Sequence, residues 1–125
     1  MFDRRLPWLL LLGALAACGG SNGSGSAAST ADSVTKAAYN NDVDGVTSSF
    51  DDHLKTQVSR AEVGVISDRM HSLGTYKGLT LLASDASKNE FTYRAAFDKG
   101  TMNVVVRLDP DGKLSAYRIF VPPGS

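Results

Sequence analysis

Residues 91–108, FTYRAAFDKGTMNVVVRL, decide the fold of this 125-residue chain. Apolar side chains fall on alternate positions in both 91–97 and 102–108, and a glycine lies between the two runs. Alternation with a period of two is typical of a strand with one buried face. A loop of two or four residues puts both apolar sets on one face, with Phe97 opposite Met102, whereas a three-residue loop would mix the faces. The sequence therefore predicts a hairpin with one apolar, aromatic face.

Two further strands flank this hairpin in the sequence. Residues 76–83 precede it, followed by the turn-forming run Ser84-Asp85-Ala86-Ser87, and 114–121 follow it after Asp109-Pro110-Asp111-Gly112. Because the connections are short, we expect the four strands to form an antiparallel meander. Pro122-Pro123 ends the last strand, since proline cannot extend a ladder of hydrogen bonds.

Helical patterns precede the strands. Helices are expected over residues 30–41, 43–50 and 59–73, where apolar residues recur at helical spacing. The last helix is the clearest, because Ser59 and Glu62 form a capping box and Gly74 ends it. The predicted fold class is therefore α+β, with three N-terminal helices packed on the apolar face of a curved four-stranded antiparallel meander.

The N-terminus carries the features of an exported lipoprotein. Arg4 and Arg5 precede the apolar run 6–17, which is shorter than the roughly 20 residues that cross a bilayer and suits a secretory signal peptide. The four residues that end at Cys18, Leu-Ala-Ala-Cys, resemble the lipobox of bacterial lipoproteins. We expect cleavage between Ala17 and Cys18 and lipidation of the Cys18 thiol. The alternative is a secreted protein whose cysteine is incidental.

These features divide the chain into a signal peptide (1–17), a lipidated cysteine with a flexible linker (18–29) and a single α+β domain (30–125). The linker is expected to be flexible because residues 19–29 contain no large apolar side chain. Gly19 follows the cysteine where an aspartate would indicate retention at the inner membrane, so we expect an anchor on the periplasmic face of the outer membrane.

Composition argues against several functions. The 13 acidic and 13 basic residues balance, and no basic stripe of the kind that binds nucleic acid is present. Cys18 is the only cysteine, and the two histidines lack the spacing of a zinc site. No nucleic-acid partner, metal, cofactor or catalytic residue is therefore assigned.

The order of elements resembles the nuclear transport factor 2-like, cystatin-like superfamily and, more narrowly, a bacterial family of uncharacterised exported domains. The matching segments are Phe50-Asp51, Leu73-Gly74-Thr75-Tyr76-Lys77, residues 97–106 and Asp111-Gly112-Lys113-Leu114. The resemblance covers about residues 30–122 and implies a sheet curved around a cone-shaped pocket, often with a homodimer through the sheet. Enzymes of this group commonly place an Asp–His or Tyr–Asp pair inside the cone.

Five side chains are the candidate ligand-binding residues: Tyr76, Phe91, Tyr93, Phe97 and Arg118. A turn with Gly112 in the left-handed conformation pairs Leu108 with Leu114 and puts Arg118 on the aromatic face, where its guanidinium would need an anionic partner. The opposite register puts Arg118 in water, and hydrophobicity does not separate the two. The four aromatic residues equally suit plain core packing.

Two pairings of carboxylate and imidazole offer acid–base chemistry. Asp51-Asp52-His53 is equally typical of a solvated turn, and Asp68 with His71 of a surface ion pair. The expected function is a lipid-anchored, non-catalytic periplasmic domain that binds an envelope protein or a small ligand. The alternative is an isomerase- or lyase-like enzyme that uses a carboxylate–histidine pair in the cone.

Overall fold

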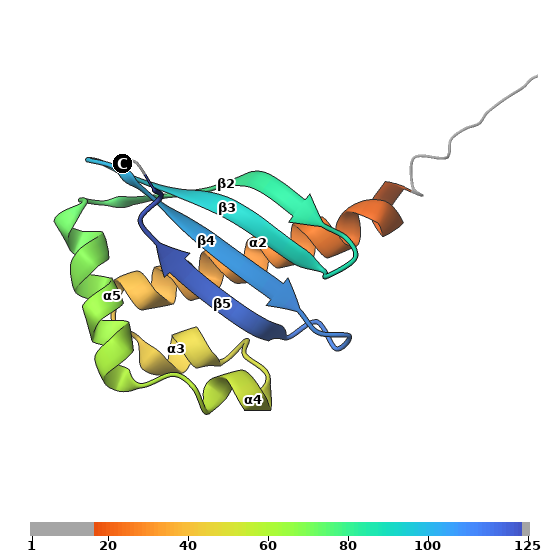
Figure 1. The fold of residues 1–125 in the computed structure, drawn as a ribbon, viewed down its shortest axis with the longest axis horizontal. Coiled ribbons are helices and arrows are strands. Elements are labelled where there is room, and N and C mark those ends of the chain that lie inside the picture. Colours follow the sequence, from red (N-terminus) through yellow and green to blue (C-terminus); the bar gives the residue numbers. More distant parts are fainter. Residues whose placement is uncertain (1–16, 124–125) are drawn as a thin grey trace, which may run out of the picture.

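The computed structural model describes the backbone of residues 17–123 and the side chains of residues 26–123. Four helices come first: α2 (Ala17–Tyr39), α3 (Val43–Thr47), α4 (Asp52–Lys55) and α5 (Arg60–Ser72). Four strands follow: β2 (Tyr76–Asp85), β3 (Glu90–Phe97), β4 (Thr101–Leu108) and β5 (Leu114–Phe120). The strands form one antiparallel sheet in the order β2-β3-β4-β5, and the helices lie on one of its faces (Figure 1). The predicted α+β meander is confirmed, with α4 as an additional helix.

The β3–β4 hairpin turns through two residues. The Phe97 N–H donates to the Gly100 carbonyl at 2.9 Å, and Ala95 lies opposite Met102. The predicted pairing of Phe97 with Met102 is therefore wrong by two residues, because the turn is as short as a hairpin allows. An even shift preserves the faces, so both apolar sets still point to the buried side.

The β4–β5 hairpin turns at Gly112, whose φ of 84° lies in the left-handed region. Its N–H donates to the carbonyl of Asp109 at 3.0 Å, and Leu108 lies opposite Leu114. Both features agree with the turn expected from the sequence.

A bulge after this turn reverses the faces of β5. Arg107 lies opposite Ala116, so Ser115 is an extra residue in the strand. Beyond it, Tyr117 faces the helices, whereas Arg118 is exposed on the other face. The placement of Arg118 on the aromatic face is therefore wrong, and the opposite register is the one observed.

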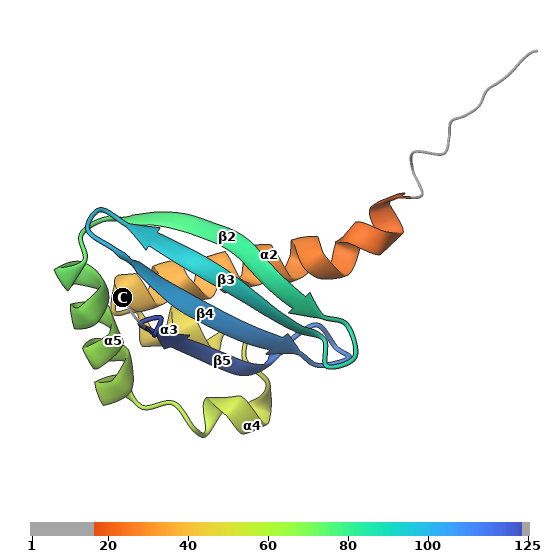
Figure 2. The same ribbon diagram turned by 45° about the horizontal axis from the view of Figure 1, so that its top comes forward.

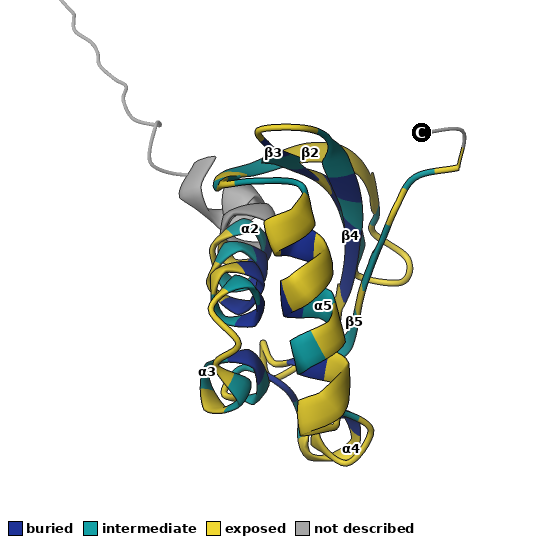
Figure 3. Ribbon diagram, turned by 90° about the vertical axis from the view of Figure 1, so that its left-hand side faces the viewer, coloured by how far each residue is buried: buried dark blue, intermediate teal, exposed yellow. Residues whose placement is uncertain are grey.

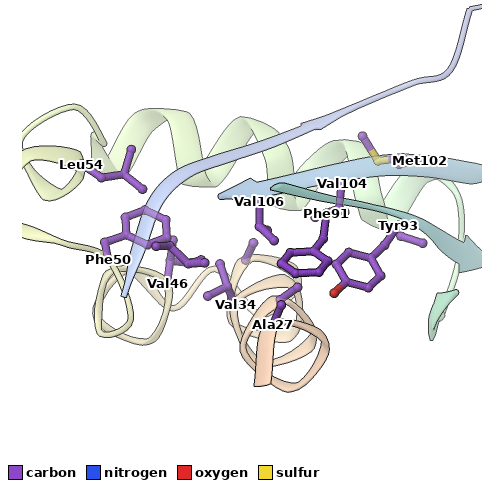
Figure 4. Close-up of a cluster of buried hydrophobic side chains, with 14 of the residues drawn as sticks. Ala27, Val34, Val46, Phe50, Leu54, Phe91, Tyr93, Met102, Val104 and Val106 are labelled. Atoms are coloured by element: carbon purple, nitrogen blue, oxygen red, sulfur yellow. The ribbon is translucent and has the colours of Figure 1, made fainter. Parts of the chain in front are cut away.

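Helix α2 begins before the position expected from the sequence. It starts at Ala17, so residues 18–29, which were predicted to be a linker, belong to it. Ala27, Ala31 and Val34 are fully buried, and Figure 4 shows Ala27 facing the rings of Phe91 and Tyr93. Alanine lets a helix approach a sheet closely, because it brings little side-chain bulk between the two backbones. Since Ala27 belongs to the core, the folded domain begins before Thr30.

Helix α5 and the loop after α3 close the core. The predicted capping box of Ser59 and Glu62 is present, and Gly74, with φ of 101°, follows the helix end. Between α3 and α4, Phe50 forms a parallel bridge with Leu114 of β5. Figure 3 shows buried residues on the inner sides of α2 and α5 and exposed residues on their outer sides.

The opposite face of the sheet carries no helix in the described part of the chain (Figure 2). The predicted signal peptide lies outside the described residues, except for Ala17. Among the helices of residues 17–123, none has both the length and the hydrophobicity that a membrane span requires.

Candidate functional site

A groove of about 460 Å³ lies between α2 and the edge strand β2. Its lining consists of Ala28, Ser29 and Asp32 from α2, Gly78, Leu79 and Leu81 from β2, and Tyr93 from β3. Leu81 is 46% exposed, so the groove is open to solvent on the side of β2. Its walls combine aliphatic side chains with one carboxylate and one phenol.

Tyr93 carries a buried polar atom that the fold leaves unsatisfied. The residue is 2% exposed, and its hydroxyl has no hydrogen-bond partner in the described part of the chain. Figure 4 shows this hydroxyl pointing from the sheet toward α2, beside Ala27. An unsatisfied buried hydroxyl costs about 1–3 kcal/mol. Burial also raises the pKa of Tyr93, so the phenol stays neutral at physiological pH.

Asp32, the carboxylate in the lining of the groove, belongs to a hydrogen-bonded triad. The Tyr76 hydroxyl donates to Oδ1 of Asp32 at 2.7 Å, and Nζ of Lys36 lies 3.1 Å from Oδ2 of the same carboxylate. Burial raises the pKa of Tyr76 strongly, and the neighbouring Asp32 raises it further. Tyr76 therefore remains a donor. Sequence reasoning missed Asp32, although its spacing of four residues from Lys36 on a helix was a readable signal.

Two irregularities in β2 shape the outer rim of the groove. The register with β3 shifts between Tyr76 and Gly78 and again between Leu81 and Ala83. Gly78 has φ of 123°, and no atom lies within 4 Å of the position that a Cβ would occupy. Bulges bend an edge strand away from regular pairing and so disfavour addition of another strand. The groove beside β2 is thus a better binding feature than the strand edge itself.

The other predicted aromatic residues belong to the core. Phe91 is 8% exposed and Phe97 is 6% exposed, and both pack in the central hydrophobic cluster. The ring of Phe97 lies 5.7 Å from that of Tyr76. Of the five predicted ligand-binding residues, the structure places only Tyr93 in the lining of the groove. Tyr76 contacts that lining through its hydrogen bond to Asp32, Phe91 and Phe97 lie in the core, and Arg118 lies on the opposite face of the sheet.

His53 lies in an exposed turn of helix. Its Nε2 is 3.0 Å from Nε2 of Gln57, and both side chains face solvent. Asp51 uses its carboxylate to cap α4, accepting from the Leu54 N–H at 2.8 Å. The segment Asp51-Asp52-His53 is therefore a solvated helix start.

His71 packs on the surface of α5. Its Nδ1 lies 2.8 Å from the Ser67 carbonyl oxygen, and its ring stacks on Tyr39 with centroids 4.0 Å apart. No ion pair joins it to Asp68 among the residues that the structure describes. Neither histidine lines the groove between α2 and β2.

A second cavity, of about 200 Å³, lies between the helices and β5. Its walls are mostly apolar and include Phe50, Ile66 and Tyr117, with the exposed side chains of Gln57 and Glu62 beside them. The Tyr117 hydroxyl already has a partner in Thr35 at 2.7 Å. This cavity lacks the unsatisfied polar atom that distinguishes the groove.

Comparison of the chain with models of known protein families, with curated proteins and with solved structures found no match. The fold and the groove define a small α+β domain with an open, amphipathic groove between α2 and β2.

Proposed function

We propose that this protein is a lipid-anchored binding domain of the bacterial cell envelope that holds a small amphipathic ligand between α2 and β2. The carrying observation is Tyr93, which lines the groove and whose buried hydroxyl has no partner among the described residues. Buried polar atoms in native proteins are nearly always hydrogen-bonded. A ligand that seats in the groove supplies the missing bond.

The walls of the groove favour a particular ligand chemistry. Ala28, Leu79 and Leu81 offer aliphatic surface to a hydrocarbon body. The lining contains the Asp32 carboxylate and no basic side chain, so it offers an anionic ligand no cation to pair with. The polar group of the ligand is therefore a hydroxyl or an amine rather than a carboxylate.

Absence of catalysis is part of this proposal. Both carboxylate oxygens of Asp32 are engaged, by Tyr76 and by Lys36, which suits a structural role better than proton transfer. The histidines lie on exposed surfaces away from the groove.

An isomerase- or lyase-like enzyme is the alternative function. The Tyr76–Asp32 hydrogen bond favours it, because enzymes of the superfamily that the sequence resembles use a Tyr–Asp pair. The carboxylate–histidine pair that this alternative was expected to use is not assembled among the described residues. Turnover of a small carbonyl substrate that disappears in Asp32→Asn would support the enzyme over the binding domain.

We infer the cone-shaped, cystatin-like subclass and the envelope location from the sequence. The order of helices followed by a four-stranded meander, and the Leu-Ala-Ala-Cys run that ends at Cys18, support them. Along α2, Ala28 lies about 15 Å from Cys18, at 1.5 Å per helical residue. A lipid anchor on the periplasmic face of the outer membrane would hold the groove close to the membrane surface, where amphipathic molecules concentrate.

The test uses residues 18–125 with Cys18→Ser, titrated with 1-octanol and with octanoate while amide NMR shifts are followed. We expect 1-octanol to shift the amides of α2 and β2 around the groove, and octanoate to bind more weakly. Tyr93→Phe should weaken binding of 1-octanol about fivefold, as expected for loss of one hydrogen bond. Tyr117→Phe removes a hydroxyl outside the groove and is the matched control. Equal binding by the Tyr93→Phe variant would exclude the proposed role of the phenol.

A further inference from the structure

No described helix covers one face of the sheet (Figure 2). This face carries two exposed arginines, Arg94 and Arg118, that have no ion pair with a described residue. In β3, β4 and β5 its outward residues include Thr92, Arg94, Asn103, Val105, Arg118 and Phe120. The register places Arg94 opposite Asn103, and Asn103 opposite Phe120. Arg118 lies one outward position from Phe120 on the same strand. Arg118 itself lies opposite Val105, the next outward residue of β4. The two arginines are therefore placed diagonally on either side of Asn103 and Val105, from strands that are roughly 10 Å apart.

The acidic side chains around this face are already engaged. Glu90 pairs with Arg107 at 3.1 Å, and Asp98 pairs with Lys77 at 3.1 Å. Arg94 and Arg118 are exposed, and neither has an ion pair or side-chain hydrogen bond with any residue in the described range. The surface around Asn103 thus carries positive charge that the domain itself does not neutralise.

Two features prepare this surface for a partner. The Arg118 guanidinium lies 5.6 Å from the centroid of the Phe120 ring, a cation–π contact that limits the freedom of the side chain. Val105 is only 6% exposed although no described helix covers it, so neighbouring side chains of the sheet shield it. A largely dry centre flanked by two guanidinium groups is typical of surfaces that bind carboxylates.

We propose that this face docks a protein partner through an acidic segment whose carboxylates pair with Arg94 and Arg118. A two-fold dimer through this face would place the arginines of both copies in one interface, and an excess of like charge at an interface is unfavourable. Charge complementarity therefore favours a different, acidic protein over a second copy.

The geometry of attachment argues against a lipid surface, and this step rests on the proposed anchor at Cys18. Helix α2 leaves the domain beyond the β2–β3 turn, at one end of the strands (Figure 1). A membrane at that end would contact the turns between the strands. The basic face would then point sideways rather than toward the membrane. The inference goes beyond ligand binding in the groove, which lies on the other side of the sheet.

The test uses residues 18–125 with Cys18→Ser and a synthetic ten-residue peptide of alternating glutamate and serine, at low ionic strength. We expect the peptide to shift the amides around Asn103, with an affinity that falls steeply as salt increases. Arg94→Gln and Arg118→Gln should each weaken binding about tenfold. Arg107→Gln is the matched control, because that arginine is already paired with Glu90.

Several results would overturn the proposal. Failure of the peptide to bind, or an equal effect of Arg107→Gln, would exclude a specific role of Arg94 and Arg118 in binding an acidic segment. Stronger binding to vesicles containing phosphatidylglycerol than to the peptide would assign the face to lipid. A dimer that sedimentation detects and that Arg118→Gln dissociates would make the face a self-interface. Binding of 1-octanol in the groove is measured separately, so each proposal can fail alone.

Discussion

The hydroxyl oxygens of Thr35 and Tyr117 lie 2.7 Å apart, although 82 residues separate them in the sequence. Thr35 is fully buried on α2, and Tyr117 points inward from β5. The hydrogen bond satisfies two hydroxyl groups inside the core and joins the longest helix to the last strand. A slip of β5 by one residue would break it and bury the Arg118 guanidinium, so this contact helps to select the observed register.

Removing one partner of this pair should cost more than removing both. Tyr117→Phe leaves the buried Thr35 hydroxyl without its partner, and we expect the free energy of unfolding to fall by about 1–3 kcal/mol. Thr35→Val combined with Tyr117→Phe should recover part of that loss, because the two apolar groups no longer need a hydrogen bond. Urea denaturation of both single variants and the double variant measures the coupling. Simple additivity of the two changes would contradict the predicted pairing.

Tyr93→Phe should have the opposite effect on stability. Since the Tyr93 hydroxyl has no partner in the described part of the chain, its removal should raise the free energy of unfolding of the ligand-free domain by about 1 kcal/mol. The same change weakens ligand binding, so stability and affinity move in opposite directions. Thermal unfolding with and without 1-octanol checks both. A destabilised Tyr93→Phe variant would mean that the hydroxyl is already satisfied.

Gly74 is required for two reasons: its backbone conformation and the lack of space for a side chain. Gly112 shares only the first reason, so the two glycines can be compared. Its φ of 101° is unfavourable for other residues, and a Cβ there would lie 2.6 Å from Cβ of Asp98. Gly112 has φ of 84° but nothing within 4 Å of the same position. We expect Gly112→Ala to cost about 1 kcal/mol from backbone strain alone. Gly74→Ala should cost clearly more, because Asp98 must also move away from the Thr75 N–H that it accepts from at 2.9 Å. Equal losses in chemical denaturation would show that the clash relaxes freely.

Stability should decrease at alkaline pH. Burial raises the pKa of Tyr76, Tyr93 and Tyr117 in the folded domain. In the unfolded chain these phenols ionise near pH 10, so the unfolded state loses protons first as the pH rises. Their stabilising contribution is complete below about pH 10 and is lost above it. Urea midpoints between pH 8 and 11 should fall, and Tyr76→Phe should reduce the slope. A flat profile would contradict burial of the phenols.

Cys18→Ser tests the proposed anchor. Expressed with its first 17 residues in a bacterial host, the unchanged chain should incorporate labelled palmitate and sediment with membranes. The Cys18→Ser variant should lose the label, because the thiol is the expected acceptor of lipid. Ser21→Ala leaves that cysteine intact and serves as the control. Palmitate retained by the Cys18→Ser variant would exclude the predicted site.

Patterns over a few neighbouring residues correctly predicted the elements that such short patterns specify, namely the strands of the central hairpin and the ends of α5. The period of two in residues 91–97 and 102–108 assigned the buried face of the central hairpin, although the pairing was wrong by an even number of residues. The capping box at Ser59 and the stop at Gly74 defined the ends of α5, since caps depend only on residues a few positions away.

The start of α2 depended on distant residues. Residues 19–29 contain no large apolar side chain, and this absence predicted a flexible linker. Ala27 becomes a core residue only because β3 supplies Phe91 and Tyr93 opposite it (Figure 4). Alanine buries too little surface for hydrophobicity to reveal such a contact from the sequence.

The sequence by itself determined the α+β class, the meander and the face that each central strand buries, because these follow from periodicity and short connections. Only the tertiary structure decided the side of the sheet on which Arg118 lies, since one bulged residue at Ser115 reverses a strand without changing its hydrophobicity. The tertiary structure also decided which residues come together at the candidate site. Asp32 and Tyr76 lie 44 residues apart and meet only when α2 packs across the sheet, and no local pattern encodes that contact.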